Sequence, residues 1–188
     1  MRRLVLLIGI GMLACVAQPA MGATSRFQPL YANGVTDVRF GRSVTFVTQR
    51  LTRVFGAPLR ARPVTLHQDC NVDSYLQFST LNVYFRGGKF VGYAYATKAD
   101  YGVRAPTRRR LTVARTIEGL EVGDTTAQAS KIYPGRFKTS TLQNGTWSVV
   151  TSSGVIRGFL SVEATSRSPL ARIATIEAGS LGCPALSP

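Results

Sequence analysis

Two stretches of the sequence decide the predicted fold: GVTDVRFGRS at residues 34–43 and EGLEVGDT at residues 118–125. They align 82 positions apart, and each ends on a hydroxyl residue, Ser43 in the first and Thr125 in the second. A hydroxyl oxygen at the start of a helix can accept a hydrogen bond from an unpaired amide of the first turn. The sequence therefore predicts a repeated unit in which each copy starts a helix after its hydroxyl residue.

The two predicted helices differ in length. Apolar side chains follow Ser43 at the spacing of one helical face, and Gly-Ala-Pro at residues 56–58 ends this helix. The helix after Thr125 is shorter, because Tyr-Pro-Gly at residues 133–135 stops it about two turns on.

Alternating apolar and polar residues predict strands after each helix. In the first half this alternation slips at Ser79-Thr80, which predicts a bulge, and Gly87-Gly88 predicts a hairpin turn. In the second half Asn144-Gly145 predicts a hairpin, and residues 172–177 are the last predicted strand. The predicted fold class is α+β, with two tandem units, each a helix followed by an antiparallel β-meander. The predicted ranges are 23–103 for the first unit, 104–115 for a basic connector and 116–188 for the second unit.

A short motif marks the first predicted helix: Phe40-Gly41-Arg42-Ser43, Val47, Val54-Phe55-Gly56 and Pro58. It resembles the helix signature of the small outer-membrane assembly lipoprotein repeat and of the β-lactamase inhibitory protein family. That family carries two tandem helix-and-sheet units in a secreted chain, and the likeness extends to other secreted bacterial proteins. The resemblance implies a binding or scaffolding module without catalysis. No inhibitory residue can be carried over, so we do not predict inhibition of β-lactamase.

Residues 1–22 have the pattern of a secretory signal peptide, with a basic start, an apolar stretch and small residues before the cleavage point. The apolar stretch is shorter than the roughly 20 residues that span a bilayer, so no transmembrane segment is predicted. We predict export, and a mature chain with a net charge of +12. The alternative is a lipid anchor on Cys15, because Met12-Leu13-Ala14-Cys15 resembles a lipoprotein signal.

Cysteine usage agrees with export. If Cys15 leaves with the signal peptide, Cys70 and Cys183 remain as an even pair in a compartment that permits disulfides. We predict a disulfide between them, with two separate thiols as the alternative.

The segment HQDCNVD at residues 67–73 raises two chemistries that we do not predict. His67 beside Cys70 suggests a thiol nucleophile, but catalytic Cys and His residues usually meet from distant positions. Its oxygen spacing resembles the start of a calcium loop, but Ser74 and Thr80 replace the required Gly and Glu. No metal or cofactor is predicted.

The charge balance is the largest functional signal, with 23 basic against 9 acidic residues. The predicted binding residues lie in and beside the connector: Arg104, Arg108, Arg109, Arg110 and Arg115. Arginine binds phosphate or carboxylate in a forked geometry, so the predicted partners are an anionic envelope polymer, a phospholipid or an acidic protein. Export argues against nucleic acid as a partner, despite its similar electrostatics. The alternative is that the charge reflects genome composition and solubility.

The predicted function is that of an exported, non-catalytic binding or interaction protein. The alternative is a secreted hydrolase with an unrecognised active site, since the chain has no G-x-S-x-G, H-E-x-x-H or C-x-x-C motif. Glu118, Glu121 and Asp124 are a cluster of acids that could suggest a glycosidase, but they also complement the dipole of the second helix.

Overall fold

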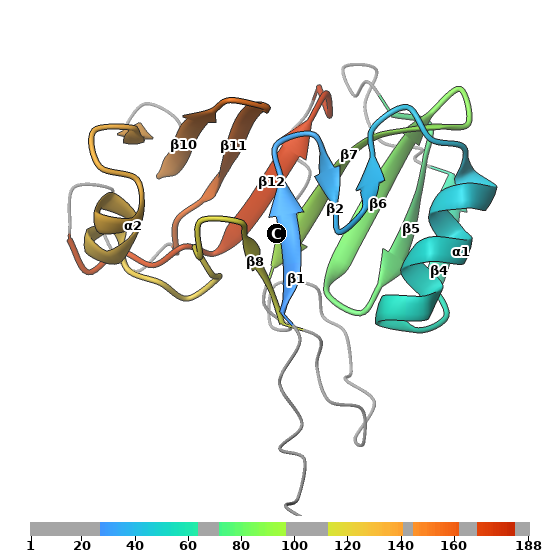
Figure 1. The fold of residues 1–188 in the computed structure, drawn as a ribbon, viewed down its shortest axis with the longest axis horizontal. Coiled ribbons are helices and arrows are strands. Elements are labelled where there is room, and N and C mark those ends of the chain that lie inside the picture. Colours follow the sequence, from blue (N-terminus) through green and yellow to red (C-terminus); the bar gives the residue numbers. More distant parts are fainter. Residues whose placement is uncertain (1–26, 64–71, 97–112, 141–144, 162–168, 183–188) are drawn as a thin grey trace, which may run out of the picture.

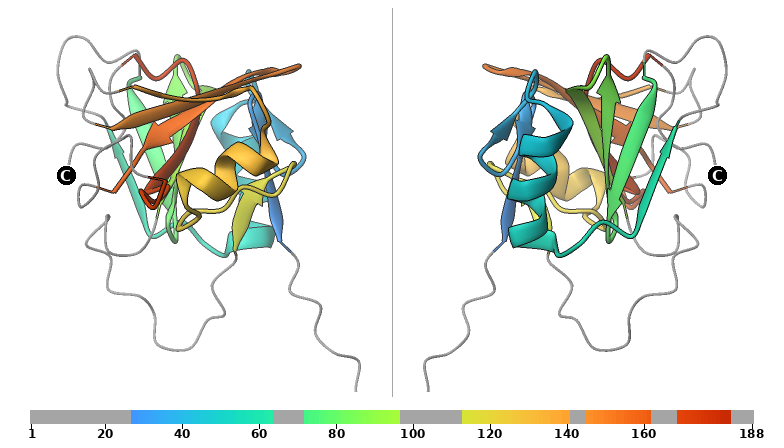
Figure 2. Two further views of the ribbon diagram at one scale, coloured as in Figure 1. Left: turned by 90° about the vertical axis from the view of Figure 1, so that its left-hand side faces the viewer. Right: turned by 90° about the vertical axis from the view of Figure 1, so that its right-hand side faces the viewer.

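The fold has two layers, an eight-stranded antiparallel sheet and a second layer of two helices and a four-stranded sheet. The computed structural model describes residues 27–63, 72–96, 113–140, 145–161 and 169–182. Figure 1 shows the small sheet in front of the large sheet, between helices α1 (Val44–Phe55) and α2 (Thr126–Ile132). The side views in Figure 2 place both helices and the small sheet on the same face of the large sheet. We call this covered face the inner face and the opposite one the outer face.

The two sheets draw their strands from both halves of the chain. The large sheet has the order β4 (Arg60–Pro63), β5 (Ser74–Phe78), β6 (Leu81–Arg86), β7 (Lys89–Ala96), β12 (Thr175–Gly179), β11 (Gly154–Phe159), β10 (Thr146–Thr151) and β9 (Phe137–Ser140). The small sheet has the order β3 (Val38–Arg39), β2 (Gly34–Val35), β1 (Gln28–Tyr31) and β8 (Ala114–Thr116). Within the small sheet, β1 and β8 pair in parallel and the other pairs are antiparallel.

Helix α1 begins and ends where the sequence predicts. The Ser43 side chain accepts a hydrogen bond from the Phe46 amide at 3.4 Å, which caps the first turn. Val47 and Leu51 are fully buried against the inner face, where α1 contacts β5 and β7. The helix ends at Gly56, whose positive φ of 85° favours glycine.

Helix α2 is the shorter helix that the sequence predicts. Thr125 and Gln128 form a capping box, in which each side chain binds the backbone N–H of the other residue. After the helix, the hydroxyl of buried Tyr133 lies 2.6 Å from Thr116 Oγ1 and 2.9 Å from Glu118 Oε2. These bonds tie the end of α2 to the turn that follows β8.

The hairpins confirm some of the local predictions and correct another. Gly87-Gly88 is the turn between β6 and β7, as predicted. Ser79-Thr80 is not a bulge but the turn between β5 and β6, with Ser79 at a φ of 56° and Phe78 paired with Leu81. The alternation slips there because the chain reverses direction.

The last strands also differ in part from the prediction. β9 and β10 pair antiparallel, as predicted, and residues 141–144 between them lie outside the described part of the chain. The last strand is β12, not residues 172–177, because Arg172 and Ile173 form only isolated bridges to Thr125 and Leu160.

The predicted fold class, α+β with two tandem helix-plus-meander units, is wrong. The structure is mostly β, because two sheets contain the strands and only two helices occur among the described residues. β7 from the first half pairs with β12 from the second half over five residues, from Thr175↔Ala96 to Gly179↔Gly92. This pairing satisfies backbone groups that two separate units would leave exposed at their sheet edges. The small sheet, which the prediction lacked, also joins β1 to β8 at the end of the predicted connector.

One hydrophobic core spans both halves. A single cluster of buried residues runs along the inner face and includes Leu51 of α1, Phe90 of β7, Ile176 of β12 and Trp147 of β10. The β7–β12 pair lies in the middle of this core, so the two halves share the burial that stabilises them.

Several predictions concern residues outside the described part of the chain. These are the signal peptide with Cys15, the segment 67–71 with His67 and Cys70, Cys183, and the arginines Arg104, Arg108, Arg109 and Arg110. They stay predictions. Within the described residues, no helix is long and apolar enough to cross a membrane, and no group of three or more His, Cys, Asp or Glu could hold a metal ion.

Candidate binding hollow on the outer face

Strand pairing aligns one residue from each strand of the large sheet in a row that crosses all eight strands. In order from β4 to β9, the row consists of Arg60, Gln77, Asn82, Ala94, Glu177, Arg157, Ser148 and Lys138. Directly paired residues point to the same face of a sheet, and their neighbours along each strand point to the other. Those neighbours include Val83, Ile176 and Val149 in the core, so the row lies on the outer face.

The row is buried in its middle and exposed toward its two ends at β4 and β9. Gln77, Asn82 and Ala94 are buried, with exposed fractions of 3%, 6% and 0%. Leu181, in the chain after β12, packs on Ala94 and is itself 1% exposed. At the β9 and β11 strands, by contrast, Lys138 and Arg157 are exposed.

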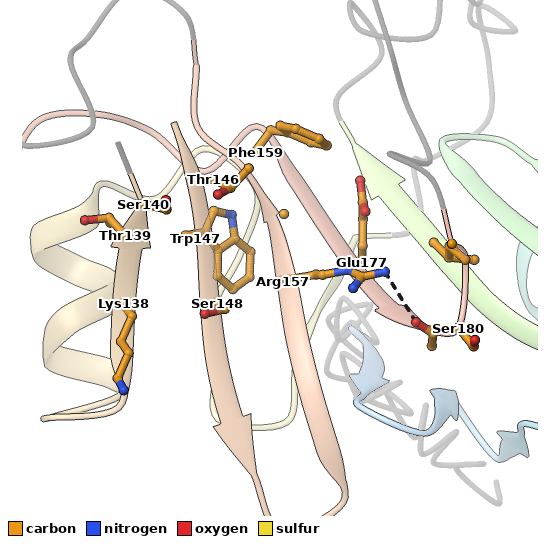
Figure 3. A pocket seen from close by; sticks show the side chains of 14 residues that line it. Lys138, Thr139, Ser140, Thr146, Trp147, Ser148, Arg157, Phe159, Glu177 and Ser180 are labelled. Atoms are coloured by element: carbon orange, nitrogen blue, oxygen red, sulfur yellow. Dashed lines mark hydrogen bonds between the residues drawn. The ribbon is translucent and has the colours of Figure 1, made fainter. Parts of the chain in front are cut away.

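A hollow of about 1210 Å³ lies over β9, β10, β11 and β12. Its lining contains the row from Glu177 to Lys138 and the chain from Ser180 to Gly182. Ser140, Thr146 and Ser148, which share the face of the row, add hydroxyl groups to this lining. Figure 3 shows these side chains across the exposed strands, and we call this site the outer-face hollow.

Glu177 lies at the inner end of the outer-face hollow, at the centre of the sheet. Its side chain lines the hollow although the residue is only 2% exposed. Burial raises the pKa of the Glu177 carboxyl to about 7, which outweighs the opposing effects of Arg157 and of the hydrogen bond from Thr175. Thr175 Oγ1 donates that bond to Glu177 Oε1 at 3.3 Å. The hollow therefore contains a carboxyl whose neutral form is favoured by burial.

Two cations follow this carboxyl along the row, and only Arg157 is directly next to it. Arg157 is paired with Glu177 in register, and its Nη2 donates to Gly179 O at 3.5 Å. Figure 3 shows the Arg157 side chain reaching from β11 toward the end of β12. Lys138 follows two strands away, so the Cα atoms of the two cations are about 10 Å apart.

Trp147 of β10 is among the residues that line the outer-face hollow, but its indole packs in the core on the inner side of the strands. Its Nε1 donates to Thr175 O at 3.2 Å, and its ring stacks on Phe137 with centroids 5.8 Å apart. Gly158 is opposite Trp147 in register, and a Cβ there would lie 2.0 Å from Thr175 O. The glycine thus lets β12 approach the indole closely.

The chain after β12 forms the wall nearest the centre of the sheet. Leu181 rests on Gly92, where an added Cβ would lie 2.4 Å from Leu181 Cδ2. Gly92 is paired with Gly179 in register. The absence of a side chain at Gly92 makes room for the crossing chain, and a Cβ at Gly179 would instead lie 2.2 Å from Val91 O of the neighbouring strand.

Of the predicted binding residues, Arg115 alone lies in the described part of the chain. It belongs to β8 in the small sheet, and so to the layer opposite the outer face. Its guanidinium carbon lies 3.8 Å from the centre of the Phe27 ring, and its Nη1 is 3.6 Å from Glu121 Oε1. The structure therefore places Arg115 away from the outer-face hollow, in contacts within the protein.

The acidic cluster near α2 is also engaged within the protein. Glu118 binds the Tyr133 hydroxyl, and Glu121 pairs with Arg115. Asp124 Oδ2 accepts a hydrogen bond from the Glu121 amide at 2.8 Å. These contacts give each carboxylate a structural role at the turn before α2.

Sequence reasoning did not single out Glu177, Arg157 or Lys138. The one available signal was an acidic residue inside an otherwise uncharged apolar strand, because TIEAG at residues 175–179 contains Glu177. Its meaning depends on the pairing of β12 with β11, which brings Arg157 beside it.

Comparison with known proteins finds no family model, no curated protein and no solved structure that matches this chain.

Proposed function

We propose that this chain is an exported, non-catalytic binding protein that holds an anionic partner in the outer-face hollow. One observation carries the proposal: two exposed cations, Lys138 and Arg157, stand in a single row across a hollow rich in hydroxyl groups. The net charge of +12 that we predict for the mature chain would add long-range attraction for such a partner.

The dimensions and chemistry of the outer-face hollow favour a polymer. Its volume of about 1210 Å³ is larger than the usual 300–1,000 Å³ of sites for small molecules. The hydroxyl groups of Thr146 and Ser148 can bind the hydroxyl groups of a glycan, and the cations can bind its acidic groups. We therefore propose a segment of an acidic glycan, such as an envelope polymer, as the occupant.

The contacts of the acidic cluster support a non-catalytic role. Glu118, Glu121 and Asp124 each bind a group inside the protein, which accounts for their crowding without a reaction. A glycosidase needs two carboxyl groups that face one another across a substrate.

Fluorescence titration with polygalacturonate tests the proposal. Trp147, the single tryptophan of the chain, lies in β10 beneath the hollow with its indole in the core, so we expect its emission to change when a ligand binds there. We expect the double variant Lys138→Ala/Arg157→Ala to bind at least about tenfold more weakly, because it loses two charge-assisted contacts. Binding of the unmodified protein should weaken with salt.

The matched control removes two charges elsewhere. Arg53→Ala/Lys131→Ala loses the same net charge at the ends of α1 and α2, and should bind within about twofold of the unmodified protein. Equal weakening of both double variants would show that charge acts generally and that the hollow is not the site. Binding to phosphatidylglycerol vesicles or to an acidic protein, without binding to polygalacturonate, would overturn the choice of partner.

A further inference from the structure

We propose that Glu177 is the residue that selects the ligand of the outer-face hollow, by donating a hydrogen bond from its protonated carboxyl to an oxyanion of the glycan. This inference rests on the proposed function and names the group that the site recognises. The oxyanion would lie between Glu177 and the two cations of the row, Arg157 and Lys138.

The strand β12 holds the Glu177 carboxyl in a fixed position. Thr175 Oγ1 accepts a hydrogen bond from the Phe159 amide at 2.9 Å and donates to Glu177 Oε1 at 3.3 Å. Trp147 Nε1 binds the carbonyl of the same threonine. Because β11 and the indole both hold Thr175, the carboxyl is supported on one side and faces the hollow on the other.

The surroundings of Glu177 favour its neutral form next to an anion. Arg157 from β11 is the charged group beside it, and Lys138 lies two strands farther along the row. Tyr84 from β6 and Tyr93 from β7 also sense its charge, but burial raises the pKa of both phenols so far that they stay neutral. Burial already raises the pKa of Glu177 to about 7, and a bound anion would raise it further.

Binding of an oxyanion at this position would therefore take up a proton. By linkage, ligand affinity then falls as the pH rises through the pKa of Glu177, by up to about tenfold for each pH unit. Lysine and arginine side chains ordinarily titrate well above this range, so binding by cations alone would give no such dependence.

The test measures polygalacturonate affinity between pH 6 and pH 9 by Trp147 fluorescence. The carboxylates of this probe have an ordinary pKa of about 4 and stay ionised throughout. We expect the affinity of the unmodified protein to fall steeply above pH 7. Glu177→Gln should bind equally well at pH 6 and pH 9, near the low-pH affinity of the unmodified protein, because the amide N–H replaces the acid O–H.

Glu121→Gln is the matched control, because it removes one carboxylate outside the outer-face hollow. It should keep the full pH dependence, and far-UV circular dichroism confirms that both variants fold. Proton uptake can be measured independently by calorimetry in buffers with different ionisation enthalpies.

The outcomes separate this inference from the proposed function. Weaker binding of Glu177→Gln at every pH would show that the ionised carboxylate is needed, and would overturn the inference. Persistent pH dependence in Glu177→Gln, or pH-independent binding that still requires Lys138 and Arg157, would also overturn it while leaving the proposed function intact. No binding at any pH, or binding unaffected by the loss of both cations, would remove the proposed function itself.

Discussion

Arginine side chains make many of the local contacts that hold this fold together. Arg39 lies over the Tyr31 ring at 4.1 Å, Arg115 over Phe27 at 3.8 Å, and Arg172 donates to Gly123 O at 2.8 Å. Arg50 pairs with Asp37. Partner binding and solubility were the two explanations that the sequence offered for its arginines. The structure adds a third, because the guanidinium group stacks on rings and caps carbonyls within the protein.

Glu177 is the residue at which we expect pH to change stability. Its pKa of about 7 in the folded protein lies above the ordinary glutamate pKa of 4.5, so the folded state binds the proton more tightly than the unfolded state. The contribution of this protonation to the free energy of unfolding is fully present below pH 4.5 and is lost as the pH rises toward and through 7. The free energy of unfolding of Glu177→Gln, relative to that of the unmodified protein, should therefore rise between pH 5 and pH 8 by at most about 3 kcal/mol.

Urea unfolding at these two pH values measures the difference. If the free energies of unfolding of the two proteins differ by the same amount at both pH values, Glu177 keeps an ordinary pKa in the folded state.

At the scale of the elements, the helix ends are the part of the fold that local sequence predicts best. Thr125→Ala removes the hydroxyl of the α2 capping box, and we expect it to lower the free energy of unfolding by about 1 kcal/mol. Thr125→Ser keeps the hydroxyl and should cost much less. Denaturant midpoints check both variants, and an equal loss in the two would show that the methyl group matters rather than the cap.

The close approach of β11 and β12 gives a sharper prediction. Gly158→Ala would place a Cβ 2.0 Å from Thr175 O, a backbone atom that cannot move without breaking the strand pair. We expect the free energy of unfolding to fall by at least about 3 kcal/mol, together with a shift in Trp147 emission. Gly135→Ala is the control, since it has open space but a φ of 69°, and should cost about 1 kcal/mol. Similar stability of the two variants would contradict this account.

Local signals account for the elements that were predicted, and non-local pairing accounts for those that were not. Ser43 and Gly87-Gly88 act within a few residues of themselves, so their helix cap and hairpin turn could be inferred from sequence. The pairing of β7 with β12 joins residues about 80 positions apart, and the sequence of neither strand specifies the strand with which it pairs. The outer-face hollow depends on that pairing, which is why Glu177 and Arg157 could not be placed together beforehand.

At the scale of the whole molecule, the shared core predicts that the two halves unfold together. Leu51→Ala opens a cavity under α1 in the first half and should lower the free energy of unfolding by about 2–5 kcal/mol. Trp147 lies in the second half, so its fluorescence reports on the opposite end of the sheet. We expect Leu51→Ala to lower the midpoints of tryptophan fluorescence and of far-UV circular dichroism by the same amount. An unchanged fluorescence midpoint would mean that the halves unfold separately.

The position of β12 also sets an order of events for the chain as it is made. Strand β12 is the last strand of the described residues, yet it fills the central place between β7 and β11. Until the ribosome has released Thr175–Gly179, both neighbouring strands present unpaired edges, and the inner face is open along the middle of the sheet. Completion of this fold is therefore a late event in synthesis. Any unfinished or truncated chain is left with two unpaired strand edges that can form hydrogen bonds with other chains.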